Sequence, residues 1–274
     1  MRFMSRTLLS ISCFALALGA VTGCDDGDAA TGEGDYRITV YGEPYIEEGI
    51  PAEEMEDGWA ITFDKFLVAI TEVRAADGLA DVPETRVFDL AIPSGGEGHA
   101  LATVTVPAAT YSDFGYRIAP AGADAVAGNA SPADVAALVA EGASLWVEGS
   151  ATKAGQTVSF AWTFRSDTTY TGCETSASVV NGGSGTSQIT IHSDHLFYDD
   201  LVSEEPFLRF DLIAGADADA DGIVTKNELS QVDITGQERY QVGNRTDIVD
   251  LWTFMVAQTA TLGHIDGEGH CDAG

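Results

Sequence analysis

The chain has 274 residues, a formal net charge of −30 at pH 7 and 45% hydrophobic residues. So acidic a chain lacks the positive surface with which proteins bind nucleic acid or bare anionic lipid headgroups, and we expect it to bind neither. Its length and hydrophobic content are sufficient for a sizeable core, in one large domain or two small ones.

Residues 1–23 predict an export signal rather than part of the fold. An apolar run over residues 7–19 follows two arginines and is too short for a permanent membrane helix. The next residues, Val21-Thr22-Gly23-Cys24, resemble the lipobox of bacterial lipoproteins, which implies that Cys24 carries a lipid. The alternative is an ordinary secretory signal with an incidental cysteine. We expect anchoring to a bacterial envelope membrane through this lipid alone, with residues 24–35 as a flexible tether.

Residues 36–200 predict a β-rich domain. Apolar and polar side chains alternate in short segments, which are separated by Gly and Pro turns. The expected strands are 36–41, 59–63, 66–73, 86–92, 101–106, 111–118, 145–149, 157–164 and 188–192. Residues 42–58 and 174–187 are expected to be loops. This pattern is typical of a mainly β, antiparallel, sandwich-like domain.

Helices are expected at four places. Ser131 before Pro132 predicts the start of a helix near 132–141, inserted in the β domain. The remaining helices fall in residues 201–274, which we expect to form a helical segment packed on the β domain. A short helix begins near 203, another begins at Thr225, and the longest spans 247–262, with Gly263 just beyond its end.

Residues 217–228 have the spacing of an EF-hand calcium loop, which takes oxygen ligands at positions 1, 3, 5, 7, 9 and 12. Those positions hold Asp217, Asp219, Asp221, Ile223, Thr225 and Glu228, where Ile223 would contribute its backbone carbonyl. Gly222 occupies position 6, at which the backbone turns sharply. We name residues 217–228 the acidic loop; the alternative interpretation is a solvated acidic segment without an ion.

These residues resemble the EF-hand family, including its extracellular bacterial members, over about 203–233. The resemblance implies Ca²⁺ binding, and the sequence contains no second such loop. We therefore expect Val224, at position 8, to pack on the β domain or on the helix at 247–262. A single extracellular loop is expected to bind Ca²⁺ with a Kd of about 10⁻⁵–10⁻³ M, which suits a structural ion.

The cysteines predict one disulfide. Of the four, Cys13 lies in the apolar leader and Cys24 is the expected lipidation site. Cys173 and Cys271 remain, an even pair in a chain expected to be exported to an oxidising compartment. We expect them to be bonded, which would tie the C-terminal tail to the β-rich part.

The histidines carry the second functional hypothesis. Four of the five lie in two groups, His192 with His195 and His264 with His270. Imidazole beside carboxylate suits Zn²⁺ or Cu²⁺, so these four residues are candidate ligands of a transition metal in the periplasm. The alternative is that they form hydrogen bonds with neighbouring aspartates.

We expect no enzymatic activity, because the sequence offers neither a strand–turn–helix nucleophile motif nor a glycine-rich phosphate loop. The leading expectation is a membrane-anchored extracytoplasmic lipoprotein that binds one Ca²⁺, with a structural role or a role in binding a protein or glycan that the sequence does not identify. The alternative is a transition-metal protein that uses the histidines.

Overall fold

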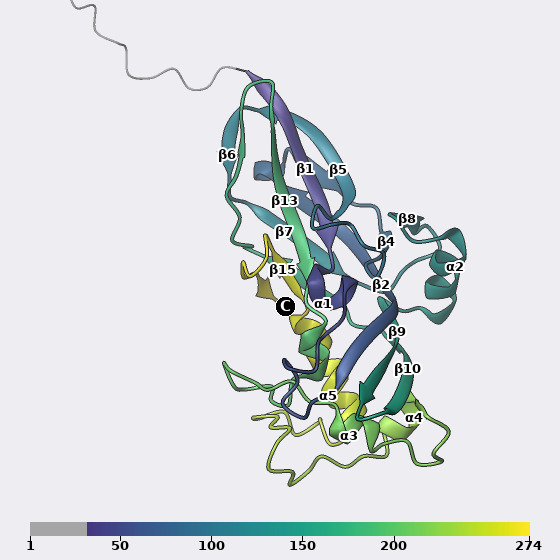
Figure 1. Cartoon of the computed structure of the whole chain (residues 1–274). Coiled ribbons are helices and arrows are strands. Elements are labelled where there is room, and N and C mark those ends of the chain that lie inside the picture. The colour runs from purple at the N-terminus through teal and green to yellow at the C-terminus, as the bar shows by residue number, and fades with distance from the viewer. Residues whose placement is uncertain (1–31) are drawn as a thin grey trace, which may run out of the picture.

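The computed structural model describes residues 32–274 and shows a mainly β protein (Figure 1). The expected signal peptide, residues 1–23, and the expected lipidation site, Cys24, lie outside the described residues. Among residues 32–274, no helix is long and apolar enough to cross a membrane.

The strands form three sheets. The four-stranded sheet has the order β15 (Gly263–Ile265), β13 (Ser184–Ile191), β1 (Glu33–Tyr41) and β5 (His99–Pro107). The ten-stranded sheet runs β14 (Ile223–Val224), β10 (Gln156–Phe164), β9 (Leu145–Lys153), β2 (Ala60–Ala75), β7 (Phe114–Ile118), β11 (Thr168–Thr171) and β16 (Asp272–Ala273). In the same sheet, β3 (Ala80–Val82) and β4 (Arg86–Asp89) pair with β2, and β8 (Val126–Ala127) pairs with β4. The third sheet joins β12 (Ala177–Val179) to β6 (Ala109–Tyr111).

Most neighbouring strands are antiparallel, as expected, but three pairs are parallel: β1 with β13, β10 with β14, and β4 with β8. The period-2 pattern of the sequence correctly places the β9–β10 hairpin, in which Leu145 pairs with Phe164. The strands expected at 59–63 and 66–73 are one continuous strand, β2, whose pairing with β9 shifts register between Phe63 and Lys65.

The four-stranded sheet lies directly against the ten-stranded sheet at β15. A Cβ atom on Gly263 would come within 2.4 Å of the Tyr116 hydroxyl and 2.6 Å of the Tyr170 ring. Only a residue without a side chain allows this approach. The rings of Tyr116 and Tyr170 stack with their centroids 4.7 Å apart, and both side chains are buried. One hydrophobic core therefore joins strands from both sheets.

The helices are short. They are α1 (Glu43–Glu47), α2 (Pro132–Glu141), α3 (Asp211–Ala214), α4 (Lys226–Leu229) and α5 (Leu251–Gln258), with 3₁₀ turns η1 (Ala76–Gly78), η2 (Asp194–Phe197) and η3 (Thr259–Thr261). The prediction of α2 is confirmed: the Ser131 hydroxyl accepts a hydrogen bond from the Asp134 N–H, and Gly142 ends the helix at φ 56°.

The C-terminal segment is less helical than its sequence predicts. The helix expected near 203 begins only at Asp211. The helix expected at 247–262 begins after Asp250, whose carboxylate caps it by accepting the Thr253 N–H at 2.9 Å, and it ends at Gln258. Gly263 belongs to β15 instead of ending a helix.

Two segments expected to be loops contain regular structure. Helix α1 lies within 42–58, and β13 begins at Ser184, inside the Ser- and Gly-rich stretch 174–187. The partners of β13 explain this difference, because β1 and β15 supply backbone hydrogen bonds on both of its sides. Tertiary pairing thus outweighs the low strand propensity of this stretch.

The expected Cys173–Cys271 disulfide is confirmed, with an S–S distance of 2.05 Å across a sequence separation of 98 residues. Next to it, β16 pairs with β11 through Tyr170 and Ala273. The bond and this pairing hold the C-terminal end of the chain against the ten-stranded sheet.

Figure 1 shows that α3, α4 and α5 gather at one end of the molecule, while β1 begins at the opposite end. The acidic loop, which connects α3 to α4, therefore lies far from the start of β1.

Candidate metal centres

The segment that leads into the acidic loop, at Phe210 and Asp211, is held in place by hydrogen bonds to residues distant in sequence. The Asp57 carboxylate accepts hydrogen bonds from the N–H groups of Phe210 and Asp211, at 2.6 and 2.7 Å, and so caps α3. The Asp211 carboxylate in turn accepts from the Trp59 indole and pairs with Lys153, both at 2.7 Å. The loop thus begins at a defined position beside β2 and β9.

The centre of the loop is fastened to the ten-stranded sheet. Residues 223–224 form β14, which runs parallel to the edge of β10. The Ser159 N–H donates to the Gly222 carbonyl at 2.8 Å, and the Trp162 indole N–H donates to the Val224 carbonyl at 2.9 Å. The Val224 side chain is fully buried. The acidic loop is therefore joined to the β domain through β10.

Three carboxylates of the acidic loop converge. One oxygen each of Asp217, Asp219 and Glu228 lies within 4.8 Å of the others. Backbone N–H groups orient them: Asp217 accepts from Asp221 at 3.1 Å and from Gly222 at 3.0 Å. Three negative charges at this separation repel one another, and a hard divalent cation with oxygen ligands relieves that repulsion.

Glu228 has a second role as a helix cap. Its Oε2 accepts from both the N–H and the hydroxyl of Thr225 at 2.8 Å, while its Oε1 accepts from the Ala218 N–H at 3.1 Å. The hydrogen bonds from Thr225 lower the pKa of Glu228, so its carboxylate stays ionised. Thr225 completes the capping box of α4 through its hydroxyl.

The structure therefore brings together three of the four predicted carboxylate ligands, namely Asp217, Asp219 and Glu228. The fourth, Asp221, lies outside this group, whereas the hydroxyl of Thr225 lies 2.8 Å from Glu228 Oε2. Asp221 Oδ1 accepts the Ile223 N–H at 2.8 Å. Positive φ angles at Ala220 (59°) and Gly222 (84°) form the tight turn between the ligand positions.

The structure also brings together three histidines, His192, His195 and His264, which we name the histidine cluster. One ring nitrogen of each lies within 4.8 Å of the others. His192 follows β13, His195 lies in η2, and His264 lies in β15, which pairs with β13. The fourth predicted ligand, His270, is exposed and stands beside His264 at a ring-centroid distance of 5.8 Å, outside the cluster.

Two rings of the cluster, those of His195 and His264, have lowered pKa values and are uncharged at neutral pH. Burial, followed by the nearby His192, lowers the pKa of His195 to about 4. Burial, followed by His192 and His195, lowers the pKa of His264 to about 4. Neutral imidazole is the form that binds metal ions.

Two glutamates lie against the cluster. Carboxylate oxygens of Glu43 and Glu268 and a ring nitrogen of His192 all lie within 4.8 Å of one another, with 3.4 Å between His192 Nε2 and Glu43 Oε2. Burial raises the pKa of Glu43, an effect that His192 opposes and that Glu268 and Asp194 reinforce.

Sequence reasoning missed Glu43, because 149 residues separate it from His192. The topology explains the encounter. Strands β1 and β13 are parallel neighbours, and Tyr41 pairs with Thr190. Glu43 and His192 therefore each stand two residues beyond a matched pair at the same edge of the sheet. To predict the contact between Glu43 and His192, one would have to know that β1 and β13 are parallel neighbours. The sequence pattern of the two strands does not reveal this pairing.

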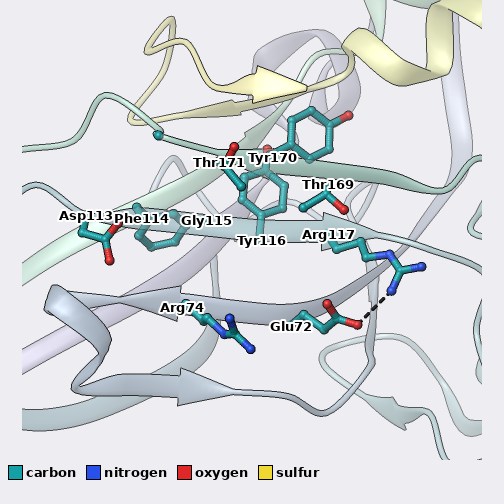
Figure 2. A pocket seen from close by; sticks show the side chains of 11 residues that line it. Glu72, Arg74, Asp113, Phe114, Gly115, Tyr116, Arg117, Thr169, Tyr170 and Thr171 are labelled. Atoms are coloured by element: carbon teal, nitrogen blue, oxygen red, sulfur yellow. Dashed lines mark hydrogen bonds and ion pairs between the residues drawn. The ribbon is translucent and has the colours of Figure 1, made fainter. Parts of the chain in front are cut away.

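A separate depression of about 300 Å³ lies on β2, β7 and β11 (Figure 2). Its most prominent cation, Arg117, is already paired: it forms a two-pronged contact with Asp167, with both distances 2.7 Å, and contacts Glu72 at 2.8 Å. Figure 2 shows Glu72 and Arg117 pointing toward each other. The carboxylates of Asp167 and Glu72 therefore satisfy this guanidinium. The other cation of the depression, Arg74, is exposed and lies 3.8 Å from Asp81.

Comparison with protein-family models, with curated proteins and with solved structures gives no significant match, so the interpretation of both metal centres rests on the residues themselves.

Proposed function

We propose that this protein is an exported, lipid-anchored protein that binds one Ca²⁺ in the acidic loop, which is carried by a sandwich-like β domain. One observation carries the proposal: the carboxylates of Asp217, Asp219 and Glu228 converge within 4.8 Å in a loop whose six ligand positions have EF-hand spacing. Nothing else in the loop neutralises these three charges, since Lys226 points its ammonium over the Trp252 ring, 5.2 Å from its centroid.

The role of the ion is structural. The helices on either side of the loop have only four residues each, too few to be stable alone. Bound Ca²⁺ offsets the repulsion between the carboxylates and holds α3 and α4 in place while β14 stays paired with β10. The ion thereby stabilises the whole end of the molecule that contains α3, α4 and α5.

The location follows from the export signal and is supported by the disulfide. A Cys173–Cys271 bond persists in oxidising compartments and is rare in the cytosol.

Calorimetric titration tests the calcium site. Chelator-stripped protein is expected to bind one Ca²⁺ with a Kd of about 10⁻⁵–10⁻³ M. The Glu228→Gln substitution preserves size but removes a charged, bidentate ligand, and we expect it to weaken binding at least about tenfold, or about 1.4 kcal/mol.

The matched control is Glu204→Gln, an exposed residue outside the loop, which should bind Ca²⁺ like the wild type. Equal binding by all three proteins would show that the heat comes from the diffuse acidic surface and would contradict the proposal.

A further inference from the structure

Unpartnered buried polar atoms gather at the histidine cluster. Among residues 32–274, five buried side-chain polar atoms lack a hydrogen-bond partner, and three of them are Ser193 Oγ, Asp194 Oδ1 and His264 Nδ1. Such an atom costs about 1–3 kcal/mol, and native proteins contain few of them. Ser193 and Asp194 connect His192 to His195 along the chain, so all three atoms belong to one small region that is short of a polar partner.

The three imidazoles have the spacing of a ligand set. Their ring centroids are 4.2 Å apart for His192 and His264, and 5.3–5.4 Å apart for the pairs that include His195. Three histidines with one open position form a known class of four-coordinate metal site. His195 Nδ1 lies 2.9 Å from the Thr261 hydroxyl, which fixes the ring and leaves Nε2 as its ligand atom.

The backbone around the cluster is held rigidly. The Asp266 carboxylate accepts the Gln188 N–H at 2.7 Å and the Thr175 hydroxyl at 2.6 Å. Asp266 and Gly267 adopt positive φ angles of 51° and 85°, which turns the chain back so that Glu268 lies beside His192. The ligands thus need little rearrangement to meet an ion.

The chemistry of the donors selects the ion. Nitrogen donors suit borderline transition metals rather than Ca²⁺ or Mg²⁺. The two cysteines among the described residues are bonded to each other, so no thiolate is present to favour Cu(I). The carboxylates of Glu43 and Glu268 lie beside His192, where their oxygens can bind or attract a divalent cation.

We propose that His192, His195 and His264 form a second metal site, independent of the acidic loop, which binds one divalent ion of the Zn²⁺ or Cu²⁺ class. The carboxylates of Glu43 and Glu268 add ligands to this site or balance the charge of the bound ion. His270 is not a ligand.

The test is a Zn²⁺ titration of the full chain in excess Ca²⁺. The wild type should bind one Zn²⁺, and His195→Ala or His264→Ala should weaken binding by more than about tenfold. His270→Ala and His99→Ala are the matched controls and should bind like the wild type, as should Glu228→Gln. An equal loss in His270→Ala, or no Zn²⁺ binding by the wild type, would overturn the proposal.

A second measurement does not depend on how the variants fold. Electron paramagnetic resonance of the wild type with one equivalent of Cu²⁺ should show coupling to three imidazole nitrogens. Coupling to none or to one nitrogen would overturn the site. Because Glu228→Gln should retain Zn²⁺ and the histidine variants should retain Ca²⁺, failure of either metal proposal is distinguishable from failure of the other.

Discussion

Removing the Cys173–Cys271 disulfide by the double substitution Cys173→Ala and Cys271→Ala should lower the free energy of unfolding by about 2–5 kcal/mol. The bond joins residues 98 positions apart, so its loss frees a long segment of the unfolded chain. Alanine avoids placing an unpartnered hydroxyl at Cys173, which is 1% exposed. The measurement is the urea midpoint of wild type and variant at the same Ca²⁺ concentration.

The wild type treated with a reductant should unfold at the same urea concentration as the double variant, since both lack the same covalent bond. Hydrogen exchange should locate the first loss of protection at β16 and β15, which lie on either side of Cys271. An unchanged urea midpoint in both proteins would contradict this prediction. It would show that the pairing of β16 with β11 is enough to hold the C-terminal end of the chain and that the disulfide adds no stability.

Ca²⁺ at a free concentration one hundred times its Kd should raise the free energy of unfolding by about 2.7 kcal/mol. For a domain of this size the change corresponds to roughly 5–10 °C in Tm. The physical reason is that the converged carboxylates of Asp217, Asp219 and Glu228 repel one another in the folded protein without an ion. Differential scanning calorimetry across a Ca²⁺ series measures the shift.

Glu228→Gln should show a much smaller Ca²⁺-dependent shift, while Glu204→Gln should follow the wild type. Mg²⁺ at the same concentration should stabilise less, because it prefers a tight octahedral shell and keeps its waters. A shift of equal size for both cations and all three proteins would indicate general screening of the acidic surface instead of a site.

The helices and strands that could be predicted from sequence are those determined by residues close together in the chain. Helix α2 follows from its cap at Ser131 and its stop at Gly142, and the β9–β10 hairpin follows from the alternation through Phe160, Trp162 and Phe164. The disulfide follows from the count of cysteines. The calcium site at 217–228 stays a prediction, with three of its four carboxylate residues brought together.

The features that escaped prediction depend on distant partners. Strand β13 begins in a Ser- and Gly-rich stretch because β1 and β15 pair with it on either side. Helix α3 begins at Asp211 because Asp57, from a distant segment, caps it. The sequence predicted His192, His195, His264 and His270 as ligands of one metal site, and the structure brings the first three of them together. The contact of this histidine cluster with Glu43 required the parallel pairing of β1 with β13, which no local pattern encodes.

A crystal structure of the protein grown in millimolar Ca²⁺ tests the central claim most directly. The account predicts one ion in the acidic loop, with oxygens of Asp217, Asp219 and Glu228 about 2.3–2.6 Å from it. The Ile223 carbonyl and Asp221 should complete the coordination. An acidic loop without an ion at saturating Ca²⁺, or Ca²⁺ bound only elsewhere on the surface, would contradict the account.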